Sequence, residues 1–172
     1  MSEPSSDVAE HAHDPLDCGI YRQPGLNRVP PISARQPAMS PDDLSRALAH
    51  PRRVSIPYLD RYSPDRPLML ECFRSHGHNP DKPVVIVQHG MSRNSAEYCE
   101  AWVPAAERHG LLILAITFPK EAWPDAVTYN NGHVLAEDGS LRPRECWSQA
   151  IPGRVFALLR EAGVTRRDKT YL

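Results

Sequence analysis

Apolar and polar residues form regular blocks only from about residue 67 onward. Three apolar runs there are typical of β-strands, and the second and third are continuously apolar, as in strands buried on both faces. The runs lie at residues 68–73, 84–88 and 111–118, and residues 169–172 are typical of the start of another. Apolar residues recur at helical spacing over residues 94–109 and 147–162. This alternation of strands and helices indicates an α/β fold with a parallel sheet.

Two prolines conflict with the predicted helices. Pro104 and Pro152 lie inside them, where proline removes a backbone donor and bends or breaks the helix. Either both helices are bent, or the second one begins near Pro152.

The part of the chain before residue 67 lacks this regular pattern of apolar and polar residues. Residues 1–38 show no apolar period, and eleven of the eighteen prolines lie in residues 1–67. Ser40 and Pro41 form a typical helix start and predict a short helix near residues 41–49. We therefore expect two parts: a Pro-rich, largely disordered and irregular segment at 1–66, and one α/β domain at 67–172.

Composition excludes several classes of function. The formal net charge is −1, which gives no basic surface for nucleic acid or an anionic membrane. No apolar run approaches the roughly 20 residues that span a bilayer. The N-terminus is polar, and the four cysteines show no metal-binding spacing. A cytoplasmic protein with reduced thiols is therefore expected, although an even cysteine count leaves disulfides open.

The most informative chemistry lies where the strand at 84–88 ends in His89 and Gly90 and the chain turns into a helix. Ligands of open parallel sheets bind at the carboxyl ends of the strands. There, the N–H of Met91 can point at a developing negative charge, as in an oxyanion hole.

These residues belong to an ordered set that continues along the chain. The set comprises His89, Gly90, Arg93, Asn94, Tyr98, Trp102, Tyr129 and Asn130. In this respect the sequence resembles the α/β-hydrolase family, in particular its esterase and polyhydroxyalkanoate-depolymerase-like branch. The resemblance implies an incomplete α/β-hydrolase-type, mostly parallel sheet with flanking helices over residues 67–172. It also implies that His89, Gly90 and Met91 form the oxyanion-hole turn.

The sequence departs from that family in one respect. The family's nucleophile lies in a Gly-x-Ser-x-Gly turn, and the 172 residues contain no such motif. By resemblance, the motif would follow the strand that residues 169–172 begin. We therefore expect an N-terminal fragment of a serine hydrolase acting on small or polymeric carboxylic esters. It would use no cofactor or metal, and alone it would have no triad-based turnover.

Several residues allow two interpretations. His89 could be catalytic, or it could pack beside the turn and fix its backbone. Ser92 lacks a recognisable base and is expected to be an ordinary loop hydroxyl. Trp123 and Tyr129, in a long polar loop, are candidates for lining a substrate cleft.

Two alternative functions remain from the sequence. One is a non-catalytic α/β interaction or binding protein. The other is a metal-binding module that uses the histidine pairs at residues 11–13 and 76–78, although solvated loop histidines are the simpler interpretation. An incomplete sheet would also expose an apolar edge, which predicts self-association.

Overall fold

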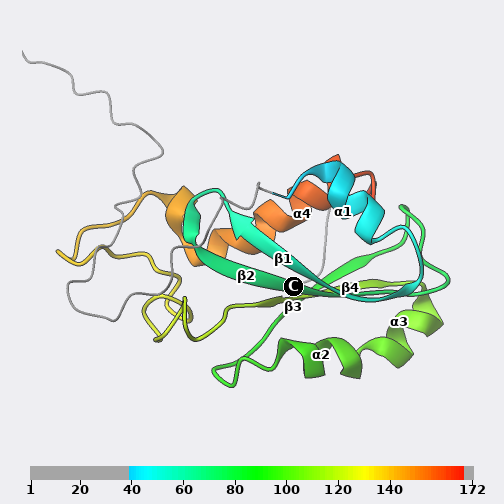
Figure 1. Cartoon of the computed structure of the whole chain (residues 1–172), viewed down its shortest axis with the longest axis horizontal. Coiled ribbons are helices and arrows are strands. Elements are labelled where there is room, and N and C mark those ends of the chain that lie inside the picture. Colours follow the sequence, from blue (N-terminus) through cyan, green and yellow to red (C-terminus); the bar gives the residue numbers. More distant parts are fainter. Residues whose placement is uncertain (1–38, 169–172) are drawn as a thin grey trace, which may run out of the picture.

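The computed structural model describes residues 39–168, and its centre is a four-stranded sheet with the order β1-β2-β4-β3 (Figure 1). The strands are β1 (Arg52–Asp60), β2 (Ser63–Arg74), β3 (Val84–Gln88) and β4 (Leu112–Thr117). The α/β class expected from the sequence is confirmed.

The sheet is mixed rather than mostly parallel. Strands β1 and β2 form an antiparallel hairpin, and β2 also pairs antiparallel with β4. Only β3 and β4 run parallel, because the helical segment between them carries the chain back across the sheet. This pair matters for the site, since its two carboxyl ends lie side by side.

Residues 52–60 were expected to be irregular, and that expectation is wrong. They form β1, in which Ile56 and Tyr58 are buried on one face while exposed Ser55 and Pro57 alternate with them. The predicted short helix is confirmed as α1 (Pro41–Ala47), whose cap Ser40 accepts a hydrogen bond from the Asp43 N–H at 3.1 Å. The segment 1–38 and the strand expected at 169–172 lie outside the described residues.

The two faces of the sheet are covered by different helices (Figure 1). Helices α1 and α4 (Ile151–Glu161) cover one face, where leucines and isoleucines from all four strands form the larger core cluster. Helices α2 (Ser95–Ala101) and α3 (Val103–His109) cover the other face over a smaller cluster. Each fully buried aliphatic side chain contributes about 1.5–3 kcal/mol.

The helix expected over residues 94–109 is broken at Trp102, just before Pro104. Proline at this position cannot donate to the preceding turn and clashes with its carbonyl, so the chain restarts as α3. Gly110 ends α3 with φ 70°. There a Cβ would lie 2.8 Å from the Gly77 carbonyl oxygen, so only glycine fits.

The remaining elements follow the long loop. Two 3-10 turns, η1 (Arg144–Cys146) and η2 (Ser148–Ala150), precede α4, which has Pro152 in its first turn. The helix therefore begins near Pro152 and is not bent there, so the second interpretation of this proline is correct. Among the described residues, no helix is long and apolar enough to cross a membrane.

The cysteines are not all reduced. Cys72 and Cys99 are free and buried, whereas Cys146 is disulfide-bonded, so the expected reduced state is wrong for Cys146. Cys18 lies outside the described residues. The cytoplasmic location and the self-association through a sheet edge stay predictions.

Candidate functional site

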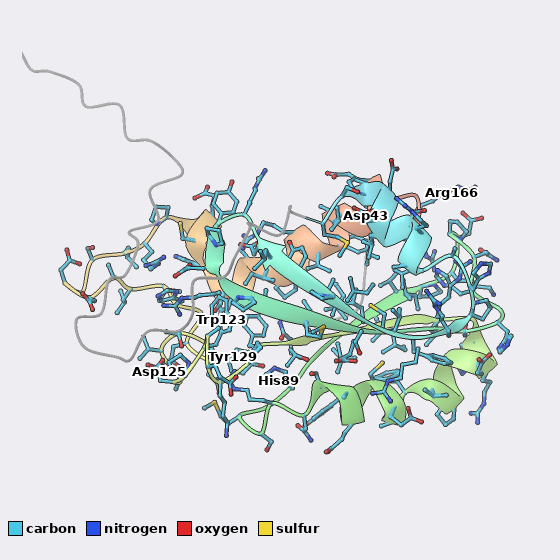
Figure 2. All side chains as sticks on the ribbon, in the orientation of Figure 1. Asp43, His89, Trp123, Asp125, Tyr129 and Arg166 are labelled. Atoms are coloured by element: carbon cyan, nitrogen blue, oxygen red, sulfur yellow. The ribbon has the colours of Figure 1, made fainter. Side chains whose placement is uncertain are left out.

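An aromatic cluster closes the carboxyl ends of β3 and β4. His89 directly follows β3, Phe118 directly follows β4, and Tyr129 comes from the long loop. The Tyr129 ring lies 4.8 Å from the ring of His89 and 4.8 Å from that of Phe118. Figure 2 shows His89, Trp123 and Tyr129 gathered at this end of the sheet. This is the edge at which the sequence predicted a site.

His89 uses both ring nitrogens on the backbone. Its Nδ1–H donates to the Gly90 carbonyl at 2.7 Å, and its Nε2 accepts from the Phe118 N–H at 3.0 Å. Burial lowers the pKa of His89, so the ring is neutral near pH 7. Of the two interpretations of His89, this geometry supports the packed one, because no ring nitrogen is left to take a proton.

The turn after β3 is held from several sides. Arg93 has φ 61°, its N–H donates to the Gly90 carbonyl at 3.2 Å, and its Nη2 donates to the Trp123 carbonyl at 2.7 Å. The Arg93 guanidinium also lies 3.9 Å from the centre of the Tyr129 ring, and the Tyr129 hydroxyl donates to the His89 carbonyl. These contacts fix the loop to both strand ends.

The exposed part of this turn comprises Gly90, Met91 and Ser92, and Met91 has an exposed fraction of 43%. Within residues 39–168, the N–H groups of these three residues have no hydrogen-bond partner. The turn is therefore braced, and the Met91 N–H is one of its free backbone donors at the carboxyl end of a parallel strand.

A cavity of about 490 Å³ opens beside the aromatic cluster. Its walls include Gln88, His89, Phe118 and Tyr129. Tyr129 thus lines a cavity, and its contact with a substrate stays a prediction. Trp123 does not line this cavity: it is fully buried behind Phe118, at 5.0 Å between ring centres, so it supports the wall rather than reaching a ligand.

The other candidate residues are not assembled into sites. Ser92 is exposed, and its hydroxyl has no partner in the described part of the chain. His76 pairs with Glu107, whereas the ring of buried His78 contacts the Gly110 and Val164 carbonyls. No group of three or more potential metal ligands occurs in residues 39–168, and residues 11–13 lie outside them.

Two contributors to the site were not predicted from the sequence. Phe118 was assigned only to the end of a strand, and Arg93 was matched to the family motif without a role. The signal for Phe118 was available, because the residue that follows a buried parallel strand lies at the ligand edge.

The comparisons with known proteins agree with this geometry. No protein-family model and no curated protein matches the sequence. Among solved structures, the chain is similar to LpqC, the poly(3-hydroxybutyrate) depolymerase from Bordetella parapertussis. The two are 45% identical, with a TM-score of 0.69, over 73% of this chain and 43% of that one. The fold is of the α/β-hydrolase type.

A second hydrolase structure supports the same fold. Poly(aspartic acid) hydrolase-1 from Sphingomonas sp. KT-1 is 27% identical, with a TM-score of 0.63, over 70% of this chain and 45% of that one. The chain thus spans less than half the length of either α/β hydrolase. The resemblance to esterase- and depolymerase-like members of the family is confirmed.

Proposed function

We propose that residues 67–172 are the N-terminal portion of a serine hydrolase acting on carboxylic esters, in which the turn at His89, Gly90 and Met91 is the oxyanion hole. One observation carries the proposal. The unpartnered Met91 N–H lies on a braced turn at the carboxyl end of β3, in a fold shared with hydrolases of polymers.

The turn suits this role because it is fixed before the reaction begins. When a nucleophile attacks an ester carbonyl, the carbonyl oxygen gains negative charge, and a preorganised N–H donor stabilises that charge. The His89 ring donates a hydrogen bond to the Gly90 carbonyl, and the Tyr129 hydroxyl donates one to the His89 carbonyl. The Arg93 guanidinium donates a third to the Trp123 carbonyl. The Met91 N–H therefore needs no rearrangement to donate.

The remaining catalytic parts are proposed to follow residue 172. The printed sequence has no Gly-x-Ser-x-Gly, and the solved relatives are more than twice as long as the aligned region. The nucleophilic serine, the acid and the catalytic histidine would then complete the site beside Tyr129 and the cavity of about 490 Å³. The similarity to a poly(3-hydroxybutyrate) depolymerase supports an ester polymer or its oligomers as the substrate class.

The test is to read and express the frame beyond codon 172, and to assay it with p-nitrophenyl butyrate. We expect a Gly-x-Ser-x-Gly motif soon after residue 172 and esterase activity in the extended protein only. Met91→Pro in that protein removes the donor and should lower kcat by about 10²–10³-fold. Met91→Ala keeps the N–H and is the matched control.

Each result bears on the proposal separately. If no reading frame of the following DNA carries the motif, the hydrolase proposal fails and the non-catalytic binding protein replaces it. If Met91→Pro and Met91→Ala have equal activity, the oxyanion role is wrong even in an active esterase.

A further inference from the structure

A second cavity, of about 530 Å³, has no lining residue in common with the first one. Arg66 of β2 and His133 and Arg142 of the long loop line it. The Arg66 guanidinium lies 5.3 Å from the centre of the Trp123 ring, and Trp123 packs on Phe118, which lines the first cavity. Buried Trp123 therefore connects a lining residue of one cavity to a lining residue of the other.

Two nitrogen atoms in this cavity are buried without a partner. Within residues 39–168, neither Arg66 Nη1 nor His133 Nδ1 makes a hydrogen bond. Buried donors are rarely left unpaired, because each loses its hydration without compensation. His133 also has φ 51°, in the left-handed region that is uncommon for residues other than glycine, although histidine is among those enriched there. An arrangement of this kind is typical of a site that a ligand completes.

The charged groups that line the cavity differ between its floor and its rim. In the described part of the chain, Arg66 forms no ion pair. Burial and the neighbouring Arg66 lower the pKa of Arg142, and burial together with both arginines lowers the pKa of His133 to about 4. The carboxylates that line the cavity are all exposed: Asp65, Glu121, Asp125 and Glu137. The rim is thus acidic, and the half-buried floor carries two guanidinium groups.

The rim also offers apolar contact. Val127 and Leu135 line the same cavity and are exposed, with fractions of 51% and 45%. A ligand that fits both parts has an anionic head for the floor and a short aliphatic body for the rim. The Arg66 guanidinium matches a planar carboxylate best, because its donors form a planar fork.

We propose that this cavity binds the carboxylate end of a short aliphatic acid, held by Arg66 and by His133 Nδ1. The biological meaning of this site rests on the proposed function, because hydrolysis of an ester oligomer releases a product that carries such a carboxylate end. The binding itself is independent of turnover.

The test is a titration of the 172-residue chain with hexanoate, with the neutral hexanamide of matched shape, and with inorganic phosphate, followed by NMR of the His133 ring. Hexanoate should bind and raise the His133 pKa from about 4, and hexanamide and phosphate should not. Arg66→Gln should weaken hexanoate binding by about tenfold or more. His133→Asn, which tolerates the left-handed backbone, should weaken it less.

Arg166→Gln is the matched control, because Arg166 is exposed and pairs only with Asp81 among the described residues, at 3.2 Å. It should leave hexanoate binding unchanged. Equal affinity for hexanoate and hexanamide, unchanged binding in Arg66→Gln, or binding of phosphate alone would each overturn the proposal. Thermal melting of each variant verifies that lost binding is not lost folding. Absence of a Gly-x-Ser-x-Gly motif from every reading frame beyond codon 172, with hexanoate binding intact, would reject the hydrolase and keep this site.

Discussion

Arg154 and Arg66 are both partly buried and both lie over an aromatic ring, yet their surroundings differ. Arg154 of α4 lies 5.0 Å from the Tyr62 ring, and Arg66 of β2 lies 5.3 Å from the Trp123 ring. Arg154 donates to both oxygens of fully buried Asp60, at 2.6 and 2.8 Å. Arg66 keeps a buried donor without a partner.

Arg154 is paired within the fold, whereas Arg66 has a buried donor for which we propose an external ligand. Arg154 links α4 to the end of the β1–β2 hairpin, and its Nη1 also donates to the Glu145 carbonyl at 2.9 Å. Its charge is fully compensated by the chain itself. Arg66 lies on β2 of the same hairpin and lines a cavity whose carboxylates are exposed, and within residues 39–168 it forms no ion pair.

The largest effect is expected for Arg154→Met. The substitution leaves the Asp60 carboxylate buried without its cation, which typically costs about 3–5 kcal/mol of unfolding free energy. Urea denaturation followed by circular dichroism measures it. Arg166→Met, at an exposed pair, is the control and should cost less than about 1 kcal/mol. A loss below about 1 kcal/mol for Arg154→Met would mean that the two arginines do not differ as described.

A smaller effect is expected from pH. Burial lowers the pKa of His78 and His89, and that of His133 to about 4, whereas an unfolded histidine titrates near 6.5. The unfolded chain therefore binds protons first, so stability is complete above about pH 6.5 and falls as the pH drops toward 4. His133 alone should account for about 1 kcal/mol or less between pH 7 and pH 5, because its ring is only half-buried and solvent screens the repulsion.

The measurement is a series of denaturation curves between pH 7 and pH 5, for the parent chain and for His133→Asn. The variant should keep the part due to His78 and His89 and lose the part due to His133. An identical pH slope in both chains would show that His133 is not desolvated. The pKa of Asp125 is also lowered, so its contribution to stability is lost only at a pH below this range. It therefore does not affect the comparison between pH 7 and pH 5.

Local signals explain what the sequence could predict of the fold. The cap at Ser40, the stop at Gly110 and the apolar run at β3 each depend on neighbours along the chain. Strand β1 was missed although Val54, Ile56 and Tyr58 alternate with polar or exposed positions, because Pro57 argues against a strand and the segment lies in the Pro-rich part of the chain. It becomes a strand through its register with β2, which the single segment does not encode.

The residues of the site also divide into those that neighbours along the chain predict and those that only the fold brings together. The turn at His89 could be predicted because the strand, the glycine and the helix start are contiguous. Trp123 was placed in the cleft because it lies in a polar loop, but Phe118 and Arg66 pack over it from β4 and β2 and bury it completely. The Arg66 site could not be predicted, since it joins β2 to a loop far along the chain.

The smallest effect is expected for Arg66→Met, the same substitution that should be damaging at position 154. It removes the cation that contacts the Trp123 ring, a contact worth about 0.5–1 kcal/mol. It also removes an unpaired buried donor and the repulsion with Arg142, which offsets that loss. The unfolding free energy should therefore change by less than about 0.5 kcal/mol, because nothing in the described fold depends on this charge. A loss above about 2 kcal/mol would show that Arg66 completes the fold as Arg154 does, and the cavity would then need no carboxylate.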